Sequence, residues 1–159
     1  MTDTAKLFGN KVRLRVCGLL FKDDSILLAK HQGIGNPGPF WLPPGGGVEF
    51  GEDARSCLVR EMKEETGLDI IPGGLQFTYQ FIRAPYHAVE LFFRIDEWSG
   101  ELKTGIDPEL PDDQQIIEEV RFVTFSEIGV MQEENVHGVF RFCRPVSQII
   151  DLRGFYSGT

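Results

Sequence analysis

The 159-residue chain is 42% hydrophobic and 25% charged, which is typical of one globular domain with its own core. Its formal net charge of −8 and pI near 4.9 argue against a general binder of nucleic acid or of anionic membranes. Three cysteines without a CxxC spacing argue against a zinc framework and indicate a reducing compartment. With no apolar run of membrane-spanning length, we expect a single cytoplasmic domain over residues 1–159.

The first third of the chain predicts a hairpin followed by a long loop. Residues 12–21 are expected to form a strand, because alternate residues from Val12 onward are apolar. The turn KDDS separates this strand from a second one at 26–30. Residues 33–47, GIGNPGPFWLPPGGG, are expected to form a glycine- and proline-rich loop that is too long for a simple connection.

A helix is predicted over residues 53–66. Ala54, Leu58 and Met62 recur every four residues and give the helix an apolar stripe. Gly67 is suited to the left-handed position that ends a helix.

The second half of the chain is expected to be richer in strands. It contains strands at 75–83, 87–98 and 116–125, an acidic loop at 100–115, a short helix at 126–130 and a possible helix, VSQIIDL, after Pro145. Strands on both sides of one amphipathic helix predict the α/β class, in which helices cover a sheet.

The helical segment REMKEETGL carries an unusual group of acids. Glu61, Glu64 and Glu65 fall within an arc of about 100° on a helix, where like charges repel by roughly 0.2–0.5 kcal/mol per pair. Three such carboxylates offer oxygen ligands to Mg²⁺, with Mn²⁺ as a substitute. The alternative is a solvated helix face whose acids pair with Arg60 and Lys63.

The stretch PPGGGVEFGE places glycines immediately before this helix. Gly46 and Gly47 allow backbone N–H groups and the positive end of the helix to approach an anion. Glycines, acids and helix together predict a phosphate site that contains a divalent metal ion.

The wider spacing from Gly46 reads G-x5-E-x7-R-E-U-x-E-E-x-G-U, where U is a bulky aliphatic residue. The specified positions are filled by Gly46, Glu52, Arg60, Glu61, Met62, Glu64, Glu65, Gly67 and Leu68. This segment resembles the Nudix box of the Nudix hydrolase superfamily. The resemblance implies an α/β/α sandwich with a mixed central β-sheet and the metal-dependent hydrolysis of a nucleoside diphosphate linked to another moiety. Substrates of this kind are ADP-ribose, a nucleotide sugar or a nucleoside triphosphate.

The resemblance also implies roles for individual residues. Glu61, Glu64 and Glu65 are expected to bind the metal, Gly46 to shape the loop, and Glu52 and Arg60 to form a supporting ion pair. The general base is either Glu64 or Glu61, or one of the downstream acids Glu90, Asp112, Asp113, Glu118 and Glu119. Many relatives place an acid near positions 115 and 116, but Gln115 and Ile116 stand there in this chain, so that group has moved. Most acids of the loop DPELPDD are expected to be solvated.

The substrate-binding residues are less sharply indicated. Arg83 near a strand end, or Arg13 and Arg15 on the first strand, could hold a terminal phosphate or a ribose phosphate, although each is also a plausible surface charge. Aromatic residues that could stack on a base, with the core as their alternative place, are Phe40, Trp41, Tyr79, Phe81 and Tyr86.

The partner expected from these features is a small nucleotide, without long nucleic acid or a membrane, and a homodimer is possible. A rival hypothesis is a non-catalytic Nudix domain that senses a nucleotide metabolite. The acidic chain shows no helix-turn-helix signal, which weighs against a regulator of that kind that binds DNA.

Overall fold

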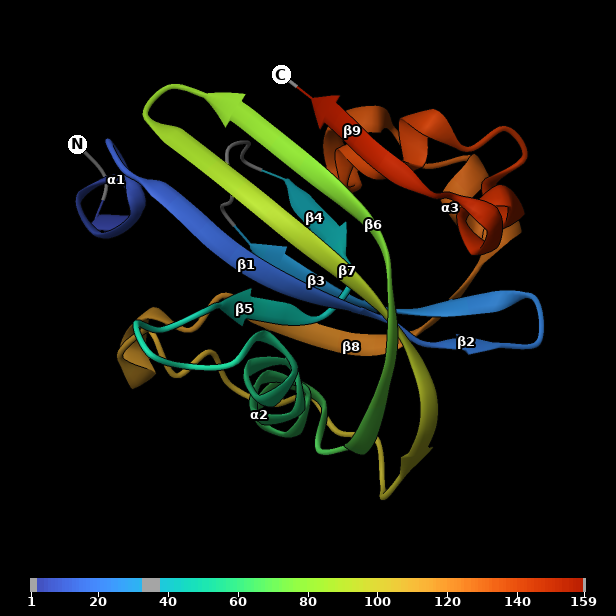
Figure 1. Cartoon of the computed structure of the whole chain (residues 1–159), viewed down its shortest axis with the longest axis horizontal. Coiled ribbons are helices and arrows are strands. Elements are labelled where there is room, and N and C mark those ends of the chain that lie inside the picture. The colour runs from blue at the N-terminus through green and yellow to red at the C-terminus, as the bar shows by residue number, and fades with distance from the viewer. Residues whose placement is uncertain (1–2, 33–37, 159) are drawn as a thin grey trace.

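The structure is a computed structural model, and it describes residues 3–32 and 38–158 (Figure 1). The strands in those ranges are β1 (Val12–Leu19), β2 (Phe21–Lys22), β3 (Ser25–Gln32), β4 (Pro39–Leu42), β5 (Gly45–Gly47), β6 (Asp69–Arg83), β7 (Tyr86–Ser99), β8 (Ile117–Thr124) and β9 (Gly154–Gly158). The α-helices are α1 (Asp3–Phe8), α2 (Ala54–Thr66) and α3 (Phe125–Gly129). Short 3-10 helices cover Asp112–Gln114, Glu133–Asn135, Gly138–Phe142 and Val146–Asp151.

The strands form two sheets. The larger sheet is mixed and has the order β5-β1-β7-β6-β9, in which β1 runs parallel to β7 and β9 runs parallel to β6. The smaller sheet is antiparallel and is centred on β3, which pairs with β2, β4 and β8. The mixed sheet and its covering helices confirm the predicted α/β class.

Helices pack on both sides of these sheets (Figure 1). The apolar stripe of α2, with Leu58 and Met62 fully buried, packs on residues of β1, β3, β7 and β8. A second apolar cluster on the other side contains Phe77, Phe92 and Ile128 and is covered by α3 and the C-terminal 3-10 helices. The chain therefore has two cores, one on each side of the sheets.

The ends of α2 follow from its sequence. Asp53 precedes the helix with extended backbone, and its carboxylate accepts hydrogen bonds from the amides of Arg55 and Ser56. Gly67 ends the helix with φ of 75° and donates its N–H to the carbonyl of Lys63 at 3.0 Å. The predicted helix is confirmed.

Several predicted boundaries are wrong. Residues 38–47 are not a loop throughout, because β4 and β5 lie within them, and residues 33–37 lie outside the described part. β6 begins at Asp69 and not at residue 75, since bulges around Pro72 let the earlier residues stay paired with β7. The segment VSQIIDL is a 3-10 helix. Neither α1 nor β9 was predicted.

No helix within the described ranges combines the length and the apolar character needed to cross a membrane.

Candidate functional site

Two of the three acids on α2 are buried. Glu61 and Glu65 are each 2% exposed, whereas the side chain of Glu64 is 29% exposed. A carboxylate has a large desolvation cost, so two buried acids one turn apart are not a solvated helix face. For this pair, the alternative of a solvated helix face is wrong, although Glu61 does pair with Arg60 of the same helix.

The glycines of β5 lie directly against these acids. A Cβ atom at Gly46 would collide with the carboxylate of Glu61, so only glycine leaves this acid room. The amide of Gly45 donates to Oε2 of Glu65 at 3.0 Å, and the thiol of Cys57 donates to the carbonyl of Gly47 at 3.4 Å. The strand β5 is therefore tied to the acidic face of α2.

Arg60 connects three of the acids. Its Nε and Nη2 donate to the two carboxylate oxygens of Glu52 at 2.9 and 3.0 Å, which is the expected supporting ion pair. Its Nη1 donates to Glu61 at 2.9 Å and to Glu64 at 3.2 Å. One guanidinium group thus joins the loop acid to two acids of the helix.

The environment separates the pKa values of these acids. Hydrogen bonding by Arg60 lowers the pKa of Glu52 to about 2, so this acid is ionised at neutral pH. Burial raises the pKa of Glu61 to about 7, despite the opposing effect of Arg60. Burial, followed by the nearby charge of Glu61, raises the pKa of Glu65 well above its ordinary value. Burial therefore disfavours the ionised forms of Glu61 and Glu65, and a bound cation would stabilise them.

The donor set suits a hard divalent cation, because it consists of carboxylate oxygens. Glu65 is buried with a single hydrogen bond, from the amide of Gly45, and it has no ion pair with any described residue. Within residues 3–32 and 38–158, no three Asp, Glu, His or Cys side chains already converge on one point that could hold a metal ion. Nη1 of Arg60 instead lies between Glu61 and Glu64, at 2.9 and 3.2 Å from their carboxylate oxygens.

Sequence reasoning missed one acid at this site, Glu109. Its carboxylate forms an ion pair with Nη2 of Arg13 at 3.0 Å, and both groups lie against Gly47, where a Cβ atom would be 2.9 Å from Arg13 and 3.0 Å from Glu109. The charge of Glu109 also contributes to the raised pKa of Glu61. The expectation concerned most acids of this loop, and Glu109, although exposed, is one that forms an ion pair.

The loop that carries Glu109 is anchored on the end of α2. The amides of Lys103, Gly105 and Ile106 donate to the last carbonyl groups of the helix, and a Cβ atom at Gly105 would collide with the carbonyl oxygen of Glu64. The side chain of Gln115 accepts from the amide of Asp107 at 2.6 Å and donates to two loop carbonyls at 2.9 Å. Gln115, which replaces the acid of many relatives, thus braces the loop that presents Glu109.

The other acids considered as a base have other partners or positions. Glu90 is buried on β7 and contacts His137 and Arg15, Glu118 pairs with Lys30, and Glu119 pairs with Arg121. Asp112 and Asp113 are exposed in the first 3-10 helix. A role for any of these acids as the base stays a prediction. In the described part of the chain, none of these acids is joined to α2 by a hydrogen bond or an ion pair.

The expected substrate-binding residues are spread across the molecule. Arg83 is exposed at the turn from β6 to β7, and it makes no ion pair with a box residue in the part of the chain described. Trp41 and Tyr79 are 7% and 3% exposed. These two aromatic residues therefore lie in the core, which was the alternative to stacking on a base. Phe40, Phe81 and Tyr86 are half-buried.

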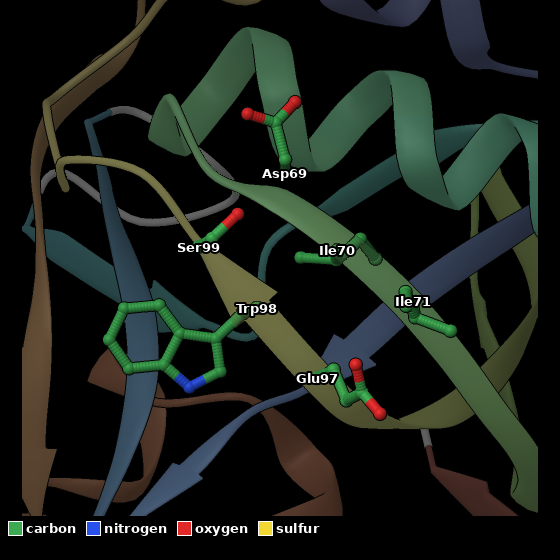
Figure 2. Close-up of a pocket in the computed structure, with 6 residues that line it drawn as sticks. All are labelled: Asp69, Ile70, Ile71, Glu97, Trp98 and Ser99. Carbon is green, nitrogen blue, oxygen red and sulfur yellow. The ribbon is translucent and has the colours of Figure 1, made fainter.

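A surface hollow of about 170 Å³ lies elsewhere, where β6 and β7 meet near the end of α2 (Figure 2). It is lined by Asp69, Ile70, Ile71, Glu97, Trp98 and Ser99. None of the acids, glycines or arginines discussed above belongs to it, so it is separate from the candidate site.

His31, on β3, makes a pH-dependent contribution to stability that can be measured. Burial, together with the charge of Arg15, lowers the pKa of His31 from 6.5 to about 4. In the unfolded chain His31 therefore takes up a proton near pH 6.5, whereas in the folded chain it does so only near pH 4. The stability linked to His31 is fully present above pH 6.5 and is lost as the pH falls toward 4.

Replacing His31 with leucine is expected to flatten this part of the pH dependence. Urea unfolding at pH 7 and pH 5 would show a smaller loss of unfolding free energy in His31→Leu than in the wild type. The control is His87→Leu, since His87 is half-buried and contacts Gln80 at 2.9 Å. An unchanged difference between the two pH values in His31→Leu would contradict the assignment.

Comparisons with known proteins agree with this geometry. The family model described as NUDIX domain matches residues 11–142. An ADP-ribose pyrophosphatase of Methanocaldococcus jannaschii is 43% identical over 94 residues, which cover 58% of this chain and 55% of that protein. An 8-oxo-dGTP diphosphatase of Proteus vulgaris is 32% identical over 81 residues, covering 51% and 72% respectively. The chain thus spans little more than half the length of the first of these relatives.

Solved structures extend the agreement to the whole fold. A MutT NUDIX hydrolase from Burkholderia pseudomallei superposes with a TM-score of 0.68 at 22% identity, covering 87% of this chain and 98% of that one. A MutT protein from Methanosarcina mazei Go1 also gives 0.68, at 19% identity, covering 89% and 95%. The family model covers most of the chain, and the residues of the box lie on the acidic helix α2 and at its two ends. This chain therefore belongs to the NUDIX domain family.

Proposed function

We propose that this protein hydrolyses the diphosphate bond of a nucleoside diphosphate linked to another group, with Mg²⁺ as its cofactor and Mn²⁺ as a substitute. The observation that carries the proposal is the pair of buried acids, Glu61 and Glu65, packed under the glycine strand β5. Relatives named as an ADP-ribose pyrophosphatase and an 8-oxo-dGTP diphosphatase support the reaction class. The substrate class is ADP-ribose, a nucleotide sugar or a nucleoside triphosphate.

Glu61, Glu64 and Glu65 would hold the cation. When bound, a divalent cation supplies charge neutralisation for the diphosphate and lowers the pKa of attacking water. The other roles in the reaction are those of the protein's own side chains and backbone. Glu52 keeps Arg60 in place through two hydrogen bonds, so that Nη1, once released from Glu61 and Glu64, can donate to a phosphate oxygen.

The edge strand β5 adds a backbone donor to this site. In the antiparallel pair with β1, Gly46 lies opposite Val16, and the flanking hydrogen bonds join Gly18 to Pro44 and Val48 to Leu14. This alternation gives Gly46 the paired position and directs the amides of Gly45 and Gly47 away from β1. The amide of Gly45 already binds Glu65, which leaves the amide of Gly47 for an anion.

For the base we favour Glu109 over the acids of α2. Glu109 stands on the loop braced by Gln115 and lies at Gly47, whereas the α2 acids are the proposed metal ligands. We expect Glu109→Gln to lower kcat about a hundred-fold. Glutamine still accepts a hydrogen bond from Arg13, so the loop should stay in place.

The matched control for Glu109 is Glu118→Gln. Glu118 is an exposed acid paired with Lys30, and its replacement should leave kcat within about two-fold of the wild type, as for a surface change. Steady-state hydrolysis of the best substrate would give both values. Equal rates in the two variants would remove Glu109 from the mechanism.

The proposed function itself is tested with a panel of ADP-ribose, nucleotide sugars and nucleoside triphosphates. We expect release of a mononucleotide from at least one of them with Mg²⁺ or Mn²⁺, and none with EDTA. No metal-dependent product from any compound would refute the proposal. Tight binding of a nucleotide without turnover would favour the metabolite-sensing alternative.

Three broader expectations stay predictions. One hydrolase domain is proposed for residues 1–159, with α1 and β9 flanking the matched region 11–142. Cys17, Cys57 and Cys143 are free and buried, which is compatible with the predicted cytoplasmic location. A homodimer has no support in the described structure and is left to solution measurement.

A further inference from the structure

Arg15 is a half-buried arginine on the strand of the larger sheet next to its edge strand β5. It lies on β1 between Gly47 of β5 and Glu90 of β7, and its side chain is 18% exposed. Its Nε is 3.3 Å from Oε1 of Glu90. Burial is the largest single effect and would lower the pKa of Arg15, but the charges of Glu90, Cys17, Glu65 and Glu109 together raise the pKa above its ordinary value. Arg15 was weighed as a surface charge from the sequence, and the structure contradicts that alternative.

A short chain of hydrogen bonds holds the partner of Arg15 in place. Nδ1 of His137 accepts the N–H of Val139 at 3.2 Å, so the ring proton is on Nε2. That proton is donated to Oε2 of Glu90 at 2.7 Å, while Oε1 faces Arg15. Burial would raise the pKa of Glu90, but His137 and Arg15 together keep it below its ordinary value. The guanidinium of Arg15 therefore faces a rigid carboxylate.

Most donors of Arg15 are unused. Its buried Nε makes no well-aligned hydrogen bond, and among the described residues no acceptor bonds its two terminal amino groups. The Nδ1 atom of His31, a side chain only 5% exposed, is also buried without a partner, and the charge of Arg15 acts on it. Buried polar groups are almost always paired, so Nε of Arg15 and Nδ1 of His31 mark an incompletely satisfied polar region, next to which the terminal amino groups of Arg15 have no partner among the described residues.

The neighbouring arginine is not available in the same way. Arg13 is bonded to Glu109 at 3.0 Å, and its guanidinium stacks 3.9 Å above the ring of Phe8. Between the two arginines on this face of β1, Arg15 is the one whose donors are free in the described structure.

Arg15 and the acids of α2 lie on opposite faces of the same strand. A Cβ atom at Gly46 would point to Glu61, whereas one at Gly47 would point to Arg13 and Glu109, on the face of Arg15. β5 is only three residues long and forms the end of the larger sheet. A substrate with its diphosphate at Glu61 could therefore reach Arg15 around this short edge strand.

We propose that Arg15 recognises the part of the substrate beyond the scissile diphosphate by donating from its terminal amino groups to two adjacent acceptors. The inference rests on the proposed function for the position of the diphosphate. Two chemical sources present such a pair: the oxygens of an additional phosphate, and the O6 and N7 edge of guanine. Adenine, which offers a donor beside N7, does not. Glu90 and His137 act as positioning residues for this arginine.

The test measures binding, so that it does not depend on turnover. Calorimetry in EDTA, where the proposed hydrolysis does not occur, compares GDP with ADP, and 2′-phospho-ADP-ribose with ADP-ribose, for the wild type and for Arg15→Lys. Lysine keeps the positive charge beside Glu90 but loses the planar fork. Inosine diphosphate serves as an internal control, because it shares the O6 and N7 edge of guanine without the 2-amino group.

The wild type should prefer the acceptor-bearing member of one pair by about ten- to hundred-fold, and Arg15→Lys should reduce that preference to about two-fold. The pair that shows the preference identifies the source, and inosine diphosphate should follow GDP if the source is guanine. No preference in either pair, or a preference that survives in Arg15→Lys, would overturn the inference.

Misfolding of a variant and failure of the proposed function can each be distinguished from a failure of the inference about Arg15. If Arg15→Lys does not fold, Arg15→Met/Glu90→Gln removes both charges together and is compared in the same way. A protein that hydrolyses the panel without an Arg15-dependent preference refutes the inference alone. A protein that binds with the preference but hydrolyses nothing refutes the proposed function and supports the inference.

Discussion

Glu64→Gln is expected to lower kcat at least about a thousand-fold while leaving the fold unchanged. Glutamine has nearly the same shape but offers one neutral oxygen, so the proposed cation would lose a charged ligand. Glu64 is the most exposed of the three helix acids, and its one ion pair is the contact with Arg60 at 3.2 Å. Its loss should therefore cost little stability.

The measurements are metal-dependent hydrolysis of the best substrate and calorimetric titration with Mg²⁺. Lys63→Gln is the matched control, because Lys63 is the neighbouring residue on α2 but points to Asp69 on the exposed side. The control should keep the wild-type rate and metal affinity. Full activity of Glu64→Gln would refute its assignment as a ligand.

Glu90→Ala is expected to destabilise the protein by about 3–5 kcal/mol, as is typical when one partner of a buried ion pair is removed. The change leaves the charge of Arg15 without a counter-ion and the Nε2 proton of His137 without an acceptor. For a domain of this size, the melting temperature should fall by roughly 6–20 °C.

Thermal unfolding of three further variants makes this prediction specific. Glu97→Ala, at an exposed position of the same strand, should change the melting temperature by a few degrees at most. Arg15→Met/Glu90→Gln should recover most of the loss, because it leaves no unpaired buried charge, whereas Arg15→Met alone should not. Equal losses in Glu90→Ala and Glu97→Ala would show that the ion pair carries no net stabilisation.

Some expectations failed for identifiable physical reasons. The strand predicted at 75–83 begins at Asp69, because bulges around Pro72 let the pairing with β7 continue. Residues 45–47 looked like loop because they are all glycine, yet pairing with β1 makes them a strand. The parallel pairing of β9 with β6 brings the C-terminus to a strand far away in the sequence, and no local pattern indicates it.

The sequence by itself determined the helix Ala54–Thr66 and the loop just before it. Their geometry is local, since Asp53 and Gly67 define the helix ends and the spacing of Glu61, Glu64 and Glu65 places these acids on one face. The family resemblance depended on the same segment, which is why fold class and box could be predicted together.

Only the tertiary structure decided which other groups join this helix. Glu109 meets Arg13 across a separation of 96 residues. Arg15 meets Glu90 through strand pairing, and Glu90 meets His137, which precedes a distant 3-10 helix. Burial also decided which acids and arginines are free surface charges and which are not. Such contacts depend on how sheets and loops pack, and side chains that are distant in sequence carry no local signal of the neighbours they will have.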